Sequence, residues 1–242
     1  MSAPSASPAR DYLGGAWTDF VHGLREAPAH SQRALIGRLF GGTLALLALI
    51  AGTAWALHVT FGDGPMPGDL AAFSVVESIL SIRRADSVTA MGGSVMLVPV
   101  VVVTALLAAR HDRPERALSI VVTFVVGKAF TKVGWTFWER ARPDGIADSI
   151  LVPPLPTFPS GHSLQAVVVW GLLGAWWFAA ARSPLERSLA AIGSVAIIVV
   201  AGLTRIRLNA HWASDVWAAW VFGAIWVGIA VWAERGFTNR HR

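Results

Sequence analysis

The chain has 242 residues, of which 54% are hydrophobic and 14% are charged. Soluble domains carry about 25% charged residues, so this composition favours a membrane protein, and the length fits one domain or one bundle of helices. The absence of cysteine excludes disulfides, thiolate nucleophiles and thiolate metal sites. The net charge of +5 does not indicate nucleic-acid binding, because the charges stand in short groups between apolar runs.

The N-terminal segment is small, polar and turn-rich, and it predicts a disordered cytoplasmic tail over residues 1–35. No apolar stretch follows at the distance that a secretory signal peptide requires. We therefore expect this segment to stay in the protein and to precede the first membrane span.

Six segments reach the length of about 20 mostly apolar residues that a spanning helix needs. They cover approximately residues 36–59, 88–109, 118–138, 163–181, 189–203 and 212–232. Between the first two, glycines and prolines interrupt the chain, and the rest of residues 62–82 predicts a short amphipathic helix at the membrane interface. The predicted fold is all-α, a six-transmembrane-helix bundle forming one domain over residues 36–234, with a cytoplasmic tail at 235–242.

The basic residues orient this bundle. With six spans, 12 of the 20 lysines and arginines fall on the side that holds both termini, so that side is predicted to be cytoplasmic. The other eight lie within or beside helices toward the outer side, where charges at membrane depth usually serve a function: Arg83, Arg84, Lys128, Lys132, Arg140, Arg142, Arg205 and Arg207. Polar residues concentrate on this outer side in three segments, at residues 132–145, 158–163 and 204–215.

The last of these segments places His211 and Asp215 four residues apart, on one face of a helix. A carboxylate one turn from a histidine can accept one ring N–H and raise the basicity of the other nitrogen, as in an activated nucleophile. A capped helix start with a buried polar pair fits the same spacing. A zinc site is a further alternative, against which the neighbouring cations Arg205 and Arg207 argue.

The middle segment contains Pro159, Ser160, Gly161 and His162, a tight turn that leads into the fourth span. Gly161 permits close backbone approach, and the first N–H groups of a helix suit an anion. Ser160 adds a hydroxyl donor, and His162 could donate a proton to a leaving oxygen. A plain loop with a serine N-cap is the alternative interpretation.

The first segment supplies cations. Arg142 precedes a proline, in a rigid position from which a guanidinium can hold a phosphate through two hydrogen bonds. Lys128 and Lys132 share one face of the third span, where lysines need a cavity or a partner. Glu139 and Arg140 are expected to form a solvated pair at the end of the helix.

Together, two histidines, one orienting carboxylate and three or four cations form a set suited to phosphoryl transfer. That reaction needs an in-line nucleophile, a proton donor for the leaving group and positive charge around the phosphoryl oxygens.

These segments resemble the signature of the type 2 phosphatidic acid phosphatase superfamily, whose lipid phosphate phosphatases share a core with vanadium haloperoxidases. The family pattern is Lys-x6-Arg-Pro, then Pro-Ser-Gly-His, then Ser-Arg-x5-His-x3-Asp. The second motif is intact at residues 159–162. The third is present with threonine in place of serine, as Thr204, Arg205, His211 and Asp215.

The first motif is altered, since Trp135 stands where the pattern has lysine. Lys132 lies three residues earlier on the same helix face, a rise of about 4.5 Å. We assign the lysine role to Lys132, with Lys128 as the alternative.

The resemblance implies a role for each matching residue. His211 attacks phosphorus and forms a phosphohistidine, Asp215 orients it, and His162 protonates the leaving lipid oxygen and then activates water. The phosphoryl oxygens are held by Lys132, Arg142, Arg205, Ser160 and the backbone N–H of Gly161. The family needs no metal or other cofactor.

The sequence therefore predicts a lipid phosphate or pyrophosphate phosphatase in the cytoplasmic (inner) membrane, with its active site on the outer face. Candidate substrates are undecaprenyl pyrophosphate, phosphatidic acid and phosphatidylglycerol phosphate. A lipid phosphotransferase, and a non-catalytic lipid transporter or scaffold of the same fold, are the alternatives. The expected partners are the lipid substrate and the bilayer, without nucleic acid, and no sequence signal points to an oligomeric state.

Overall fold

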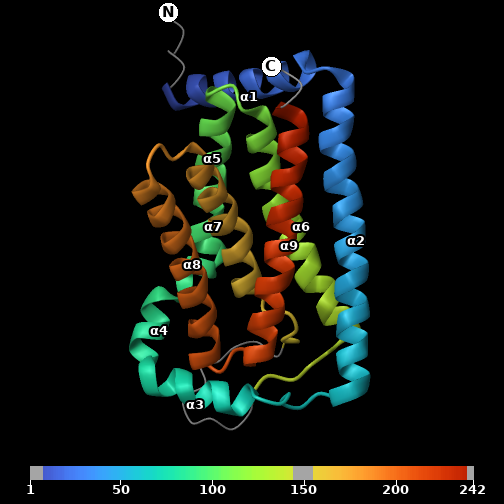
Figure 1. Cartoon of the computed structure of the whole chain (residues 1–242), viewed down its shortest axis with the longest axis vertical. Coiled ribbons are helices and arrows are strands. Elements are labelled where there is room, and N and C mark those ends of the chain that lie inside the picture. The colour runs from blue at the N-terminus through green and yellow to red at the C-terminus, as the bar shows by residue number, and fades with distance from the viewer. Residues whose placement is uncertain (1–7, 144–154, 239–242) are drawn as a thin grey trace, which may run out of the picture.

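The computed structural model describes residues 8–143 and 155–238, and the regular elements within these ranges are all helices. The long helices run side by side, while α1 lies across one end of the bundle and α3 lies across the other (Figure 1). The elements are α1 (Pro8–Glu26), α2 (Ala29–Phe61), α3 (Asp69–Ile79), α4 (Ile82–Val88), the 3-10 helix η1 (Thr89–Gly92), α5 (Ser94–Arg110), α6 (Pro114–Phe137), α7 (Gly161–Ala180), α8 (Pro184–Arg207) and α9 (Ala213–Thr238).

Six helical stretches in the described ranges are long and apolar enough to cross a membrane: Ala29–Phe61, Ile82–Arg110, Pro114–Phe137, Gly161–Ala180, Pro184–Arg207 and Ala213–Phe237. Large apolar side chains point outward along these stretches, as at Val95 and Ile192, which are 90% and 69% exposed. An outer surface of this kind is suited to lipid rather than water. The predicted all-α bundle with six spans is confirmed, and the protein is a multi-pass membrane protein.

The N-terminal segment differs from its prediction. Residues 8–35, expected to be disordered, form α1 and the first turns of α2. Asp19 of α1 pairs with Arg110 at the end of α5, with 2.6 Å between Oδ2 and Nη1. The Gln32 side chain donates to the carbonyls of Leu24 and Ala27 at 2.8 and 2.7 Å, which fixes the corner between α1 and α2. At the other terminus, α9 continues through part of the predicted tail to Thr238.

The fifth span is longer than its predicted range of 189–203, because strong signals lie at both of its ends. Ser183 and Glu186 form a capping box in which Ser183 Oγ accepts the Glu186 N–H at 3.1 Å, and Pro184 occupies the first helical position. At the other end, Arg205 and Arg207 are still helical, and their side chains donate to Thr89 Oγ1 and to the carbonyl of Leu80. Charged residues that end an apolar run can therefore still be helical.

The short helix predicted within residues 62–82 is α3, and a second short helix, α4, follows it from Ile82, the last residue of that segment. Gly62 and Gly68 adopt φ values of +65° and +91° in the loop before α3, a conformation that favours glycine. The loop directs α3 across the ends of the spans (Figure 1).

The interior of the bundle is built around α7, which packs against α6, α8 and α9. Its Leu164, Val168 and Leu172 are fully buried. A Cβ at Gly134 of α6 would overlap the backbone of Phe158 and the ring of Pro159. This glycine therefore lets the loop before α7 lie directly on α6, at the bundle end covered by α3.

Candidate active site

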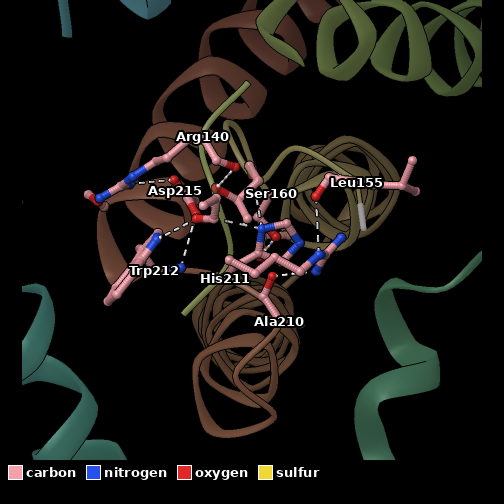
Figure 2. A network of polar contacts seen from close by, with 12 residues as sticks. Arg140, Leu155, Ser160, Ala210, His211, Trp212 and Asp215 are labelled. Carbon is pink, nitrogen blue, oxygen red and sulfur yellow. Dashed lines mark hydrogen bonds and ion pairs between the residues drawn. The ribbon is translucent and has the colours of Figure 1, made fainter. Parts of the chain in front are cut away.

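The second and third motifs meet where α7 and α9 begin. The backbone N–H of Ser160 donates to the carbonyl of Asp215 at 3.1 Å, which joins the two helix starts. Figure 2 shows His211 beside Ser160 and Asp215, with Arg140 on the far side of the carboxylate. The structure thus brings together residues that are about 50 positions apart in the sequence.

His211 is buried, with 4% of its surface exposed. Its Nδ1 lies 2.9 Å from the carbonyl oxygen of Thr157. Because a carbonyl only accepts, this hydrogen bond places the proton on Nδ1 and leaves the lone pair on Nε2. Asp215 Oδ2 lies 3.7 Å from the same Nδ1, close enough for an ion pair but too far for a strong hydrogen bond. Thr157, which the motifs did not indicate, therefore shares the orienting role expected of Asp215.

The surroundings of His211 favour its neutral form. Burial lowers the pKa of His211, Asp215 opposes this by raising it, and the charges of Arg205 and Arg142 lower it again. The net direction is downward from the ordinary value of 6.5. At neutral pH the ring is therefore neutral, with its one proton on Nδ1, and its Nε2 lone pair is available.

This direction gives a prediction for the pH dependence of catalysis. Below its pKa, His211 takes a proton on Nε2 and cannot attack, so kcat/KM should fall on the acid side with a midpoint below pH 6.5. Initial rates across a series of overlapping buffers, with protein integrity checked at each pH, measure this midpoint. A midpoint above 6.5 would contradict a neutral nucleophile held in this environment.

The contacts of Asp215 lie largely away from His211. Its Oδ1 is 2.6 Å from Nη1 of Arg140, and its Oδ2 accepts the backbone N–H of Trp212 at 2.9 Å. Arg140 has no exposed surface, so the prediction of a solvated pair with Glu139 is wrong. One feature of the sequence could have indicated that Arg140 is buried. Arg140 and Arg142 are alternate residues of a non-helical segment, and alternate residues of an extended chain point to the same side.

Arg142 is half-buried and held by backbone carbonyls. Its Nε donates to the carbonyl of Leu155 at 3.2 Å and its Nη1 to the carbonyl of Ala210 at 2.5 Å. Nη2 makes no hydrogen bond to the residues that the structure describes. Burial lowers the pKa of Arg142 while Asp215 raises it, and the guanidinium stays charged at neutral pH. Nε and Nη1 of this cation are therefore held by protein carbonyls, and Nη2 is available to an anion.

Arg205 is also buried, with 8% of its surface exposed. Its Nη1 donates to Thr89 Oγ1 of η1 at 2.9 Å, while its Nε is buried and has no hydrogen-bond partner in the described part of the chain. An unpaired buried donor on a charged group is costly. A phosphoryl oxygen would supply the missing acceptor.

His162 stands in the first turn of α7, next to η1. A Cβ at Gly92 would overlap the carbonyl of His162, and one at Gly93 would lie 3.5 Å from its Nε2. The cationic charges of Arg205, Lys128 and Arg142 all act on this ring. The predicted proton donor therefore lies within the same group of cations as His211.

The rest of the Pro-Ser-Gly-His turn is packed closely around it. Ser160 is buried, and its Oγ lies 2.9 Å from Ser163 Oγ. Gly161 begins α7, and a Cβ there would lie 3.3 Å from the Thr131 side chain of α6. The free N–H groups at this helix start can face an anion.

The structure does not bring Lys132 into this group. Its side chain is exposed, with Nζ 4.5 Å from the centre of the Trp135 ring. Lys128, one turn earlier, donates from Nζ to Ser94 Oγ at the start of α5 at 2.8 Å, and its charge reaches His162. The geometry favours the alternative lysine over the assigned one.

The two lysines give a matched test. Lys128→Ala should lower kcat/KM about tenfold, equivalent to about 1.4 kcal/mol of transition-state stabilisation, because a cation that acts on His162 is lost. Lys132→Ala, on the same helix, should change kcat/KM little. The reverse ranking in steady-state assays would restore the assignment of Lys132.

Comparisons with known proteins identify the family and the fold of this chain. The model of the PAP2 superfamily matches residues 116–238. Phosphatidylglycerophosphatase B of Bacillus subtilis (strain 168) is 25% identical over 141 residues, which cover 57% of this chain and 68% of that protein. The crystal structure of a transmembrane PAP2-type phosphatidylglycerolphosphate phosphatase from Bacillus subtilis matches with a TM-score of 0.62 at 21% identity, covering 83% of this chain and 97% of that one.

The family match, the relative and the six spans define the class of this protein as an integral membrane phosphatase. The match extends over just over half of the chain, and the protein belongs to the PAP2 superfamily. Family and relative together support a membrane lipid phosphate phosphatase. The family, fold and enzyme class that the motifs predict are confirmed.

Proposed function

We propose that the protein releases phosphate from a membrane lipid through a phosphohistidine at His211. The observation that carries this proposal is the hydrogen bond from Nδ1 to the Thr157 carbonyl, which leaves the Nε2 lone pair of a buried, neutral ring for attack. Asp215, 3.7 Å from Nδ1, stabilises the positive charge that the ring gains.

In the first step, Nε2 of His211 forms a bond to phosphorus while the bond from phosphorus to the lipid oxygen breaks. His162 donates a proton to that oxygen, so the lipid leaves as an alcohol, or as a monophosphate when the substrate is a pyrophosphate. In the second step, His162 takes a proton from water, whose oxygen attacks phosphorus. The N–P bond breaks, inorganic phosphate is released, and the neutral ring of His211 is restored.

The phosphoryl oxygens would be held by donors that are already in place. Arg205 offers its unpaired Nε and Arg142 its Nη2, while Ser160 and the Gly161 N–H approach from the start of α7. The lysine contribution comes from Lys128 or Lys132. Donors fixed before the reaction stabilise developing charge without reorganisation. A site rich in arginine, whose carboxylate is paired with Arg140, suits an anion better than a metal ion.

Among the candidate substrates, phosphatidylglycerol phosphate is favoured by the name of the Bacillus subtilis relative. Phosphatidic acid and undecaprenyl pyrophosphate present the same phosphoryl chemistry. We place the protein in the cytoplasmic membrane with the site on the outer face, because 12 of 20 basic residues fall on the opposite side. A tag at residue 242 should then be inaccessible from outside intact cells.

Phosphate release by the detergent-purified protein tests the function directly. The assay contains EDTA and compares the three lipids, with wild type run beside His211→Ala. Release by wild type alone would support a metal-independent histidine phosphatase, and the panel would rank the substrates. Transfer of label to an added alcohol in place of water would indicate a phosphotransferase. No turnover of any substrate would favour the non-catalytic alternative.

A further inference from the structure

Arg140 is a fully buried cation outside the reaction steps above. Its Nη1 lies 2.6 Å from Asp215 Oδ1 and 2.8 Å from Ser214 Oγ, and its Nη2 lies 2.7 Å from Asp69 Oδ2. Its Nε and Nη2 also donate to the carbonyl of Gly64 at 3.3 and 3.0 Å. All three guanidinium nitrogens are thus engaged by protein groups, and the side chain serves the protein rather than a ligand.

Asp69 begins the interfacial helix α3 and is 2% exposed. Its Oδ1 accepts the backbone N–H of Ser214 at 2.8 Å, and its Oδ2 accepts the Ser214 hydroxyl at 2.9 Å. The first N–H groups of a helix lack partners within the helix and carry partial positive charge. A carboxylate from α3 therefore caps the start of α9, one residue before Asp215.

The aromatic neighbours restrict Arg140 further. Its guanidinium carbon lies 4.7 Å from the centre of the Trp138 ring and 5.4 Å from that of Trp212. A planar cation with aromatic neighbours and two carboxylates has little freedom to move. The position of Asp215 is fixed accordingly.

We propose that Arg140 and Asp69 form a positioning pair, which sets the place and the charge environment of Asp215 and, through it, of His211. The proposal rests on the proposed function, in which His211 is the nucleophile. Neither residue touches the substrate in that mechanism, so both act through the residues that do.

The pair predicts two opposite electrostatic effects. Arg140, Asp69 and Asp215 together carry a net charge of −1. Among the residues that the structure describes, the charged and titratable groups that face His211 are Asp215 from α9, Arg205 from α8, His162 from α7 and Arg142 from the loop before α7.

Arg140→Gln would leave two uncompensated carboxylates and stabilise protonated His211, so the acid limb of kcat/KM should move to higher pH. Asp69→Asn would make the network neutral, so the limb should move to lower pH. A role limited to holding the fold together gives no reason for opposite shifts.

The experiment measures kcat, KM and the pH profile of kcat/KM for both variants in detergent. Arg140→Gln should lower kcat about 100-fold with KM nearly unchanged, since a misplacement of about 1 Å at a catalytic group has an effect of that size. Arg140→Lys should recover part of kcat, because it restores the charge without the planar fork. Matched controls at the same end are Arg84→Gln and Asp63→Asn, which change exposed residues and should leave both profiles unchanged.

A second readout separates this proposal from the function on which it rests. Carbon-13 NMR of labelled histidine, with the His211 signal assigned through His211→Ala, follows ring protonation whether or not the protein turns over. Opposite displacements of the His211 titration in Arg140→Gln and Asp69→Asn support the positioning pair. Unchanged titration, or displacement in the same direction, overturns it.

The remaining outcomes are also decisive. If Arg140→Gln does not fold, the isosteric Asp69→Asn decides alone: a titration shifted to lower pH supports the pair, and an unshifted one overturns it. If wild type releases no phosphate while the two titrations move apart, the proposed function fails and the pair stands. If wild type is active and the titrations coincide with those of the controls, only the positioning pair fails.

Discussion

His211→Ala should lower kcat by at least about 10⁴-fold, because loss of a covalent nucleophile removes the reaction path and leaves only binding and charge stabilisation. The ring that is lost is buried and has its Nδ1 proton fixed by Thr157. Water would have to attack phosphorus directly, without a nitrogen held in place. Phosphate release from the best lipid of the panel measures the effect.

A covalent intermediate gives a more specific test of the same residue. Rapid acid-free quenching of wild type with phosphorus-labelled lipid should trap label on the peptide that contains His211. The matched control is His58→Ala, which changes an exposed histidine at the end of α2 and should retain activity and label. Label on His162 in place of His211 would reverse the roles of the two histidines.

Arg205→Ala should lower kcat/KM about 10³-fold, the size of effect seen when an arginine that stabilises a transferring phosphoryl group is removed. Its buried Nε has no partner in the described residues, and its Nη1 is fixed by Thr89, so the side chain is prepared for an anion. Arg205→Lys should recover little, since an ammonium cannot reproduce two parallel N–H donors.

Arg83→Ala serves as the control for this arginine, because Arg83 is exposed on α4 at the same end of the bundle. Thermal unfolding of each variant distinguishes lost catalysis from lost protein. A kcat/KM within tenfold of wild type for folded Arg205→Ala would remove this residue from the phosphate site.

The parts of this site that could be predicted are those encoded by local spacing. His211 and Asp215 stand four residues apart, and the Pro-Ser-Gly-His turn starts a helix, so short motifs indicated both segments, although His211 lies in the turn before α9 and not on the helix. The spans followed from apolar length alone. Each motif and each span could be predicted because all of its residues lie in one continuous stretch of the sequence.

The parts that the sequence did not reveal depend on partners that lie far away in the chain. Arg140 beside Glu139 has the appearance of a surface pair, and only Asp69, 71 residues earlier, and Asp215, 75 residues later, make it a buried cation. The spacing from Arg142 indicates Lys132, whereas only the fold shows that Lys128 donates to Ser94, the neighbour of Gly93 beside His162. The helix α1 was missed because its polar residues have the composition of a tail.

The contacts of Arg140 also bear on the order in which the protein is made. Asp69 and Arg140 both precede α9 in the chain, and their ion pair of 2.7 Å needs nothing from α9. Because the chain is made from its N-terminus, both residues of this pair are synthesised before α9. The pair then presents a ready acceptor for Ser214 and a cation for Asp215 as the final helix enters the membrane. Because His211 lies in the turn before that helix, the nascent chain acquires its nucleophile only in the last stage of insertion.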